Sequence, residues 1–225
     1  MADKISVSLP KGEAMASLAD YFATIGFSIQ NYNAKNRTYR PEIKDLQVRA
    51  KIMAEKDVAI QVAVGNYDIG FCGMDWIQEL RVRYRGTKLH VFKQLELNRK
   101  NLYACTSLKG KLQSVRDLTA KHDFVTIISE YPNLAEDFAI RHRLKKFKIF
   151  SAWGRAEAYP PEHADVVILA AYNENALNRI GLHKITKESE SALCIVINRK
   201  SFLEKDLSHV LQFFSEQTEM NNDTK

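Results

Sequence analysis

The sequence predicts an α/β protein, because short apolar runs typical of buried strands alternate with segments of helical periodicity along the whole chain. Two connections, near residues 94–98 and 183–190, divide it into an outer part and an inserted part. We therefore expect two lobes with a cleft between them. Lobe I takes residues 1–94 and 184–225, and lobe II takes residues 95–183.

Composition is that of a globular protein: 45% of the 225 residues are hydrophobic and 27% are charged. No apolar run approaches about 18 residues and the first residues lack a secretory h-region, so neither a membrane span nor export is expected. Cys72, Cys105 and Cys194 lie in apolar runs without metal-ligand or redox spacing. We interpret them as buried thiols of a cytoplasmic protein, the alternative being a catalytic thiol.

The net charge of +6 suits phosphorylated small molecules, and it also suits nucleic acid. Basic residues are spread along the chain, with small clusters at Arg81–Arg85 and Arg141–Lys148. Neither a zinc-finger spacing nor an RNA-binding aromatic motif accompanies them. We therefore expect a small anionic ligand rather than nucleic acid.

The first half of the chain begins with a strand signal at Ile5–Leu9, followed by helical periodicity over residues 14–25 until Gly26. Residues 31–44 are polar and are expected to form a loop or an irregular hairpin. Asp57 is expected to cap the next helix. Further strands are expected at 46–48, 69–72, 89–92 and 102–105, and further helices at 58–64 and after Asp75.

The second half continues the alternation. The β-branched run 124–128 predicts a buried strand. Asn173 is placed to cap a helix that Gly181 closes. An amphipathic pattern predicts one C-terminal helix over 203–220, followed by a frayed tail. Other strands are expected at 147–150, 166–169 and 193–197, other helices at 115–118, 134–144 and 174–180, and a loop at 154–163.

Two turns carry residue types that suit ligand binding. The apolar run ending at Cys72 is followed by Gly73 and Asp75, a strand, glycine and acidic helix start typical of the mouth of an open α/β sheet. Lys11 and Gly12 follow the first strand, where a lysine can meet an anion at a helix N-terminus. A solvated surface lysine is the alternative for Lys11.

Four stretches of the chain carry further motifs, and they are Ser8–Gly12, Asp57–Gly65 with Asp68–Asp75, Tyr131–Asn133 and Gly154–Pro160. Together they resemble the short form of ATP phosphoribosyltransferase, the enzyme that opens histidine biosynthesis. The first stretch matches the family's Pro-Lys-Gly-Arg turn apart from the arginine, the second is the most specific match, and the third matches the family's Tyr/Phe-Pro-Asn turn.

This resemblance implies a two-lobed fold of the type II periplasmic-binding-protein kind. It implies transfer of phosphoribosyl from phosphoribosyl pyrophosphate to N1 of ATP, with Mg²⁺ offsetting the charge of the departing pyrophosphate. Lys11 and Asp75 match positions that line the cleft, and Glu157 matches the acid beside the ribose. The short form works with a separate subunit resembling the catalytic domain of a histidyl-tRNA synthetase, and we expect no regulatory domain within this chain. Such a subunit and further copies of this chain are the candidate partners.

The chain departs from the family at the loop that grips the ribose 5-phosphate. Leu169 stands where the family has an acidic residue, and Glu174 stands where it has a glycine. Asn173 and Ala176 stand where the family has its first and second threonines. Glu174 places negative charge where a phosphate is expected, and the loss of the glycine adds a steric obstacle. Arg155 replaces a serine beside Glu157 and offsets part of this change.

Two functions follow as alternatives: a divergent active transferase, and an inactive family member that binds a nucleotide or another small ligand. Catalytic residues and protein metal ligands are not assigned. The predicted substrate-binding residues are Lys11, Gly12, Gly73, Asp75, Arg155, Glu157, Asn173, Glu174, Asn175 and Ala176.

Overall fold

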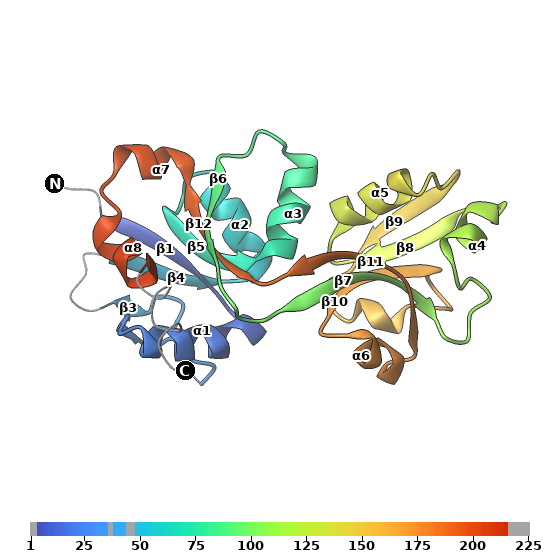
Figure 1. Ribbon diagram of the computed structural model, residues 1–225, viewed down its shortest axis with the longest axis horizontal. Helices are drawn as coiled ribbons and strands as arrows, with labels where there is room; N and C mark the ends of the chain where they lie inside the picture. The colour runs from blue at the N-terminus through green and yellow to red at the C-terminus, as the bar shows by residue number, and fades with distance from the viewer. Residues whose placement is uncertain (1–3, 36–37, 44–47, 216–225) are drawn as a thin grey trace, which may run out of the picture. The chain divides into compact units, whose positions relative to one another are not determined.

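A computed structural model describes residues 4–35, 38–43 and 48–215, and its ribbon is drawn in Figure 1. The chain folds into two compact units. Unit 1 takes in Met1–Gly73, Gly86–Asn98 and Leu193–Lys225, and unit 2 takes in Met74–Arg85 and Arg99–Ala192. Each unit is built on its own five-stranded mixed sheet, so the predicted α/β class is confirmed.

Unit 1 has the sheet order β4-β1-β5-β12-β6. Strands β4, β1 and β5 run parallel, while β12 runs antiparallel to both β5 and β6. A two-stranded antiparallel pair, β2 with β3, lies outside this sheet. The bounds are β1 Ile5–Pro10, β2 Ile29–Gln30, β3 Glu42–Ile43, β4 Val48–Met53, β5 Ile69–Gly73, β6 Leu89–Gln94 and β12 Leu193–Asn198.

Helices cover both faces of the unit 1 sheet. On one face, α1 (Glu13–Thr24) and α8 (Ser208–Ser215) bury an aromatic cluster in which the Phe22 ring centroid lies 5.1 Å from that of Phe71. On the other, α2 (Glu55–Ala63) packs on β5 at Gly70. Helix α7 (Arg199–Glu204) begins where the Asn198 side chain accepts hydrogen bonds from the N–H groups of the first turn.

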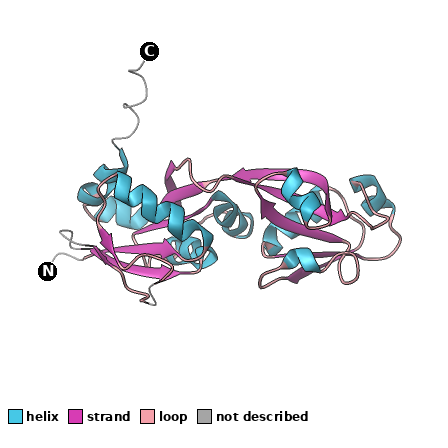
Figure 2. Cartoon of the chain, turned by 90° about the horizontal axis from the view of Figure 1, so that it is seen from below, coloured by secondary structure: helices cyan, strands magenta, loops and turns pink. Residues whose placement is uncertain are grey.

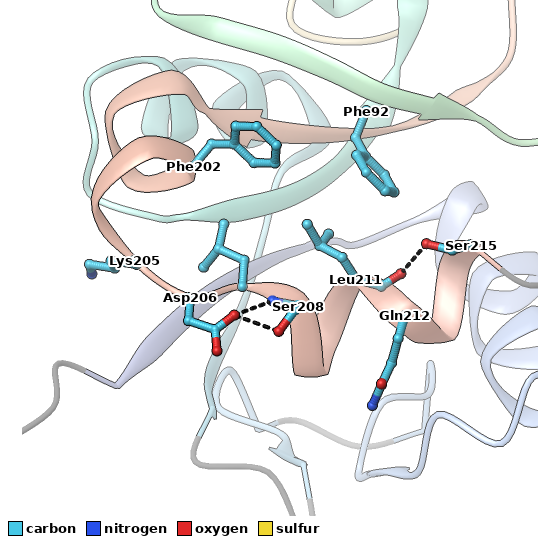
Figure 3. A pocket seen from close by; sticks show the side chains of 9 residues that line it. Phe92, Phe202, Lys205, Asp206, Ser208, Leu211, Gln212 and Ser215 are labelled. Atoms are coloured by element: carbon cyan, nitrogen blue, oxygen red, sulfur yellow. Dashed lines mark hydrogen bonds between the residues drawn. The ribbon is translucent and has the colours of Figure 1, made fainter.

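A hollow of about 450 Å³ lies beside α8 in unit 1 (Figure 3). Phe92, Phe202, Leu207 and Leu211 supply its apolar lining. Since none of the predicted substrate-binding residues lines it, this hollow does not belong to the predicted site.

Unit 2 has the sheet order β11-β7-β10-β8-β9. Strand β7 runs antiparallel to both of its neighbours, and β10, β8 and β9 run parallel to one another. The bounds are β7 Lys100–Ser107, β8 Val125–Ser129, β9 Phe147–Ser151, β10 Val166–Ala171 and β11 Leu182–Ser191.

Each face of the unit 2 sheet has its own apolar cluster. Residues of α4 (Val115–Ala120) and α5 (Pro132–Arg141) cover one face, with Trp76 of α3 (Met74–Arg83) packed against them. The other face is covered by the short helix η1 (Ala156–Ala158) and by α6 (Glu174–Arg179). Figure 2 shows helices on both sides of the strands.

Helix α3 packs on α5 through polar as well as apolar contacts. The Trp76 and Tyr131 ring centroids lie 4.4 Å apart. The carboxylate of Glu79 accepts hydrogen bonds from the N–H groups of Asn133 and Leu134, at 2.9 and 2.8 Å. These are N–H groups of the first turn of α5, which have no partner inside the helix. Glu79 therefore caps α5 from a neighbouring helix.

Several sequence-based expectations are wrong. Helix α2 begins after Ala54, so Asp57 lies in its first turn and does not cap it. A single helix over 203–220 is not formed, because the chain turns out of α7 at Lys205 and Asp206 then accepts bonds from Ser208 at the start of α8. Residues after 215, including the tail, lie outside the described part of the chain, as do residues 46 and 47.

The stretch 183–190, taken from sequence as a connection, is part of strand β11. Because β11 pairs with β7 over its whole length, residues 184–192 fall in unit 2. Helix α3 also falls in unit 2, because it packs on α5. Units 1 and 2 therefore divide the chain at different positions from lobes I and II. The boundaries of the two lobes stay a prediction. Among the described residues, no helix is long and apolar enough to cross a membrane.

Asp68 is a buried carboxylate of unit 1 with several donors. Its Oδ2 accepts from the N–H and the hydroxyl of Ser6, each at 2.8 Å, and its Oδ1 lies 3.1 Å from Lys205 Nζ. Burial raises its pKa, but the hydrogen bonds from Ser201, Ser6 and Lys205 outweigh burial, and the pKa is held below its usual range.

A depressed carboxylate pKa stabilises the fold above the unfolded-state pKa of about 3.9, and this contribution is lost as pH falls through the folded-state value. We expect Asp68→Asn to lower stability at neutral pH and to flatten the loss of stability below about pH 4. Urea unfolding between neutral and acid pH measures both effects. Parallel pH profiles for the two proteins would contradict this role.

Candidate substrate-binding site

The turn after β5 holds two of the predicted residues. Gly73 is the last residue of β5 in unit 1, and its N–H donates to Glu55 Oε1 at 2.6 Å. Asp75 lies in the first turn of α3 in unit 2. The strand, glycine and acidic helix start expected from sequence are present at these residues.

Asp75 is only 5% exposed, and its carboxylate is hydrogen-bonded inside unit 2. Its Oδ2 accepts from the Tyr131 hydroxyl at 2.6 Å and its Oδ1 from the Ser191 hydroxyl at 2.9 Å. The Asp75 N–H donates back to Ser191 Oγ at 3.0 Å. Asp75 therefore links α3, α5 and the end of β11, and its contact with substrate stays a prediction.

The turn after β1 carries Lys11 and Gly12 in unit 1. Lys11 is exposed, and its N–H donates to the Met53 carbonyl of β4 at 2.8 Å. Gly12 precedes α1 with a φ of 85°, a left-handed conformation that glycine adopts without strain. The backbone of this turn is thus fixed by β4 while the lysine side chain reaches solvent.

The turn from β10 to α6 in unit 2 replaces the family's phosphate loop. Asn173 is extended and caps α6: its side-chain oxygen accepts from the Ala176 N–H at 3.0 Å, as the sequence predicted. Glu174 and Asn175 are the first helical residues and both are exposed. Their N–H groups have no partner within the helix, because they belong to its first turn.

Glu174 does not adopt a conformation that needs glycine, since it sits at the start of a regular helix. Its Oε1 lies 2.5 Å from Nζ of Lys184 on β11. The hydrogen bond to Glu174 raises the Lys184 pKa above its usual value, so the ammonium stays charged at neutral pH. The negative charge introduced into the turn is therefore paired with a cation.

Two further side chains border this turn. Lys100 Nζ lies 5.4 Å from the ring centroid of Tyr172, and Asn101 Nδ2 donates to the Tyr172 carbonyl at 3.4 Å. Cys105 is buried in β7 near them, and burial, together with Glu174, raises its pKa to about 12. A thiol with such a pKa stays protonated, which argues against the alternative of a catalytic thiol at this position.

Arg155 directly precedes η1 and Glu157 is its middle residue, and η1 covers the same face of the unit 2 sheet as α6. Ala156 of η1 and Leu177 of α6 belong to one buried apolar cluster, which brings the two segments together. Arg155 is exposed and adopts a left-handed φ of 50°. Glu157 is half-buried.

The ten predicted residues thus fall into two groups. Lys11, Gly12 and Gly73 lie in unit 1 and the other seven in unit 2. Among the residues that the structure describes, no three His, Cys, Asp or Glu side chains gather as a metal site.

The fold defines the class of protein. It resembles the alkanesulfonate-binding protein SsuA from Xanthomonas axonopodis pv. citri bound to MOPS, with a TM-score of 0.56 and 12% identity, over 95% of this chain and 72% of that one. It also resembles the ATP phosphoribosyl transferase (HisG:HisZ) complex from Thermotoga maritima, with a TM-score of 0.74 and 19% identity, over 93% of this chain and 94% of that one. The chain therefore has the periplasmic-binding-protein type of fold.

Sequence comparison gives the family. The family model of ATP phosphoribosyltransferase matches residues 54–216, and this chain belongs to that family. ATP phosphoribosyltransferases of Chlorobium chlorochromatii (strain CaD3) and Prosthecochloris aestuarii (strain DSM 271 / SK 413) are each 28% identical to it, over 198 and 200 residues. Those alignments cover 88% of this chain and 65% of each relative, so the chain spans about two thirds of their length.

Sequence reasoning missed the residues that neutralise or border the substituted turn. Lys184 was not singled out, because β11 was not recognised as a strand that passes beside α6. The sequence marks Tyr131 only as part of a turn, and it gives no signal that Tyr131 or Ser191 contacts Asp75. The available signal for a strand in this mostly polar stretch was the β-branched pair Ile185 and Thr186.

Proposed function

We propose that this chain transfers the phosphoribosyl group of phosphoribosyl pyrophosphate to N1 of ATP, with release of pyrophosphate. The family match over residues 54–216 supports the reaction class. The observation that carries the proposal is the ion pair between Glu174 and Lys184, because it removes the main electrostatic objection to a phosphate at this turn.

An unpaired Glu174 about 4 Å from a phosphate would oppose binding by roughly 4 kcal/mol at an effective dielectric near 20. With Lys184 at 2.5 Å from the carboxylate, the pair is formally neutral. The N–H groups of Glu174 and Asn175 then remain as donors to the 5-phosphate. Lys100 is a further cation beside the turn.

The other predicted residues have proposed roles within this reaction. Lys11 contacts an anionic group of substrate, and Arg155 and Glu157 contact the ribose end. Mg²⁺ bound to the diphosphate would supply positive charge that offsets the charge of the leaving pyrophosphate. Asp75 acts indirectly, by accepting hydrogen bonds from Tyr131 and Ser191 and so fixing their positions.

The test is a turnover assay with ATP, phosphoribosyl pyrophosphate and Mg²⁺, with chromatographic detection of phosphoribosyl-ATP. The chain is assayed alone and together with a histidyl-tRNA-synthetase-like subunit, which we propose as a regulatory partner because one similar structure is a HisG:HisZ complex. Product in either arm supports the proposal, and its absence in both contradicts it. Self-association is measured in the same preparations. A cytoplasmic location fits three buried cysteines that are not joined in disulfides.

Lys184→Met leaves the Glu174 charge in the turn without its cation. We expect phosphoribosyl pyrophosphate to bind at least roughly tenfold more weakly to this variant, and the double change Glu174→Gln with Lys184→Met to recover most of the loss. Calorimetric titration measures the three affinities. Lys187→Met is the matched control, because Lys187 lies on the same strand and is paired with Glu190 instead. Equal losses in both single variants would contradict the role of Lys184.

An inactive ligand-binding protein is the second candidate function. The observation in its favour is that the turn offers no hydroxyl group at Asn173 or Ala176, where the family has threonines. This candidate predicts that ATP or another small ligand binds while phosphoribosyl pyrophosphate does not. Tight calorimetric binding of phosphoribosyl pyrophosphate would exclude it.

A further inference from the structure

The excess positive charge of the chain is concentrated in one segment. Residues 138–156 contain six of the 33 Lys and Arg residues and none of the 27 Asp and Glu residues. The remainder of the chain therefore carries 27 of each and is formally neutral, so the whole net charge of +6 comes from this segment. It spans the end of α5, the turn after it, β9 and the chain up to η1.

The cations of this segment are exposed, and most of them have no ion pair within the described part of the chain. Arg141 is engaged by Asp137 and Glu188. The other four at the turn and on β9 have no ion pair with any residue of the described ranges, and they are Arg143, Lys145, Lys146 and Lys148. We call these four cations, together with β9, the basic edge.

Strand β9 is the outer strand of the unit 2 sheet and pairs only with β8 among the strands described (Figure 1). The Lys146 carbonyl accepts from the Val125 N–H, and the Ala152 N–H donates to the Ser129 carbonyl. The backbone N–H and C=O groups of the even-numbered residues of β9 therefore point toward β8. By the alternation of a parallel ladder, the N–H and C=O groups of Phe147, Ile149 and Ser151 point outward. An extended peptide can pair with such a row.

Large apolar side chains accompany the basic edge. Phe150 is 54% exposed and Trp153 is 86% exposed. Lys148 Nζ lies 4.4 Å from the ring centroid of Phe124, a neighbouring exposed aromatic residue. Lysines alone can serve to protect an edge strand from aggregation, but exposed aromatic residues beside them do the opposite.

We propose that the basic edge binds an acidic, extended segment of a partner protein, which adds to the unit 2 sheet alongside β9. Backbone groups pair with Phe147, Ile149 and Ser151, and the partner's carboxylates meet the four cations. A second copy of this chain that pairs through β9 is a poor occupant, because residues 138–156 contain no Asp or Glu to meet the cations of the other copy. Single-stranded nucleic acid would satisfy the charges but has no means of forming the backbone ladder.

The probe is a short labelled peptide in which Glu alternates with Val, titrated by fluorescence anisotropy against the full chain. We expect saturable binding that weakens with salt, and slower amide exchange at Phe147, Ile149 and Ser151. The same peptide with alternate amides N-methylated is expected to bind at least roughly tenfold more weakly, because the ladder is lost. Equal binding of the methylated peptide would overturn strand addition.

The second part of the test reverses the charge of basic residues and measures binding of the same peptide. The triple change Arg143→Glu, Lys145→Glu and Lys146→Glu is expected to weaken peptide binding at least roughly tenfold. Reversing Lys51, Lys88 and Lys200, which are exposed in unit 1, changes the net charge equally and is expected to have less than about a twofold effect. Similar losses in both variants, tighter binding of oligouridine than of the peptide, or no binding of the peptide at low salt would each overturn the proposal.

Discussion

Gly70→Ala is expected to be the most damaging single methyl addition in unit 1. A Cβ at this position would lie 2.7 Å from Ser8 Oγ, from Val58 Cγ1 and from Val62 Cγ2. Val58 and Val62 are fully buried on α2, so the helix must move away from β5 to make room. Overpacking of this kind costs about 3 kcal/mol, at the upper end of the usual range.

Urea unfolding of wild type and variant measures this loss. Gly86→Ala is the matched control, because a Cβ there meets nothing within 4 Å and its backbone is not left-handed. The control is expected to be neutral or slightly stabilising, by up to about 1 kcal/mol. If Gly70→Ala were as stable as Gly86→Ala, the close approach of α2 to β5 would be wrong.

Among changes to polar residues, Asp75→Ala in unit 2 is expected to cause the largest loss of folding stability. The change removes the acceptor of the Tyr131 and Ser191 hydroxyls and leaves both donors in a buried place. Hydrogen bonds to a charged acceptor contribute about 1.5–3 kcal/mol each, so we expect a loss of about 3 kcal/mol in total. Activity is expected to fall with it, because α3 and α5 lose a shared contact.

Tyr131→Phe and Ser191→Ala each remove one donor and are expected to cost less than Asp75→Ala. Combined with Asp75→Ala, each should add little, since the partner is already gone. Additive losses in these double variants would contradict the bonding described for Asp75. A variant that stays folded and loses only substrate affinity would instead favour direct contact of Asp75 with substrate.

Much of the fold follows from local pattern. The buried strands β5, β8, β10 and β12 are apolar runs bounded by turns, and the sequence predicts each of them to within one or two residues. The Asn173 cap was also predicted, because its residue type and position specify it. Strand β11 was missed for a physical reason. A half-buried edge strand with two register shifts keeps few apolar residues, so its periodicity is weak.

The sequence predicts which residue types lie at the candidate site, but it does not predict which residues pair with them. The sequence marks Glu174 as an intruding charge, yet the cation that pairs with it is ten residues away on another element. Asp75 was expected to face substrate from its place at a helix start. Its burial depends on Tyr131 and Ser191, which are distant in sequence and meet it only in the fold.

The most direct measurement is an amide NMR titration of the full chain with phosphoribosyl pyrophosphate and Mg²⁺. If the turn after β10 still receives a phosphate, the N–H resonances of Glu174 and Asn175 shift saturably, and less so in Lys184→Met. Unchanged resonances at these two residues, while ATP binds elsewhere on the chain, would contradict the proposed phosphate site and the transfer reaction that depends on it.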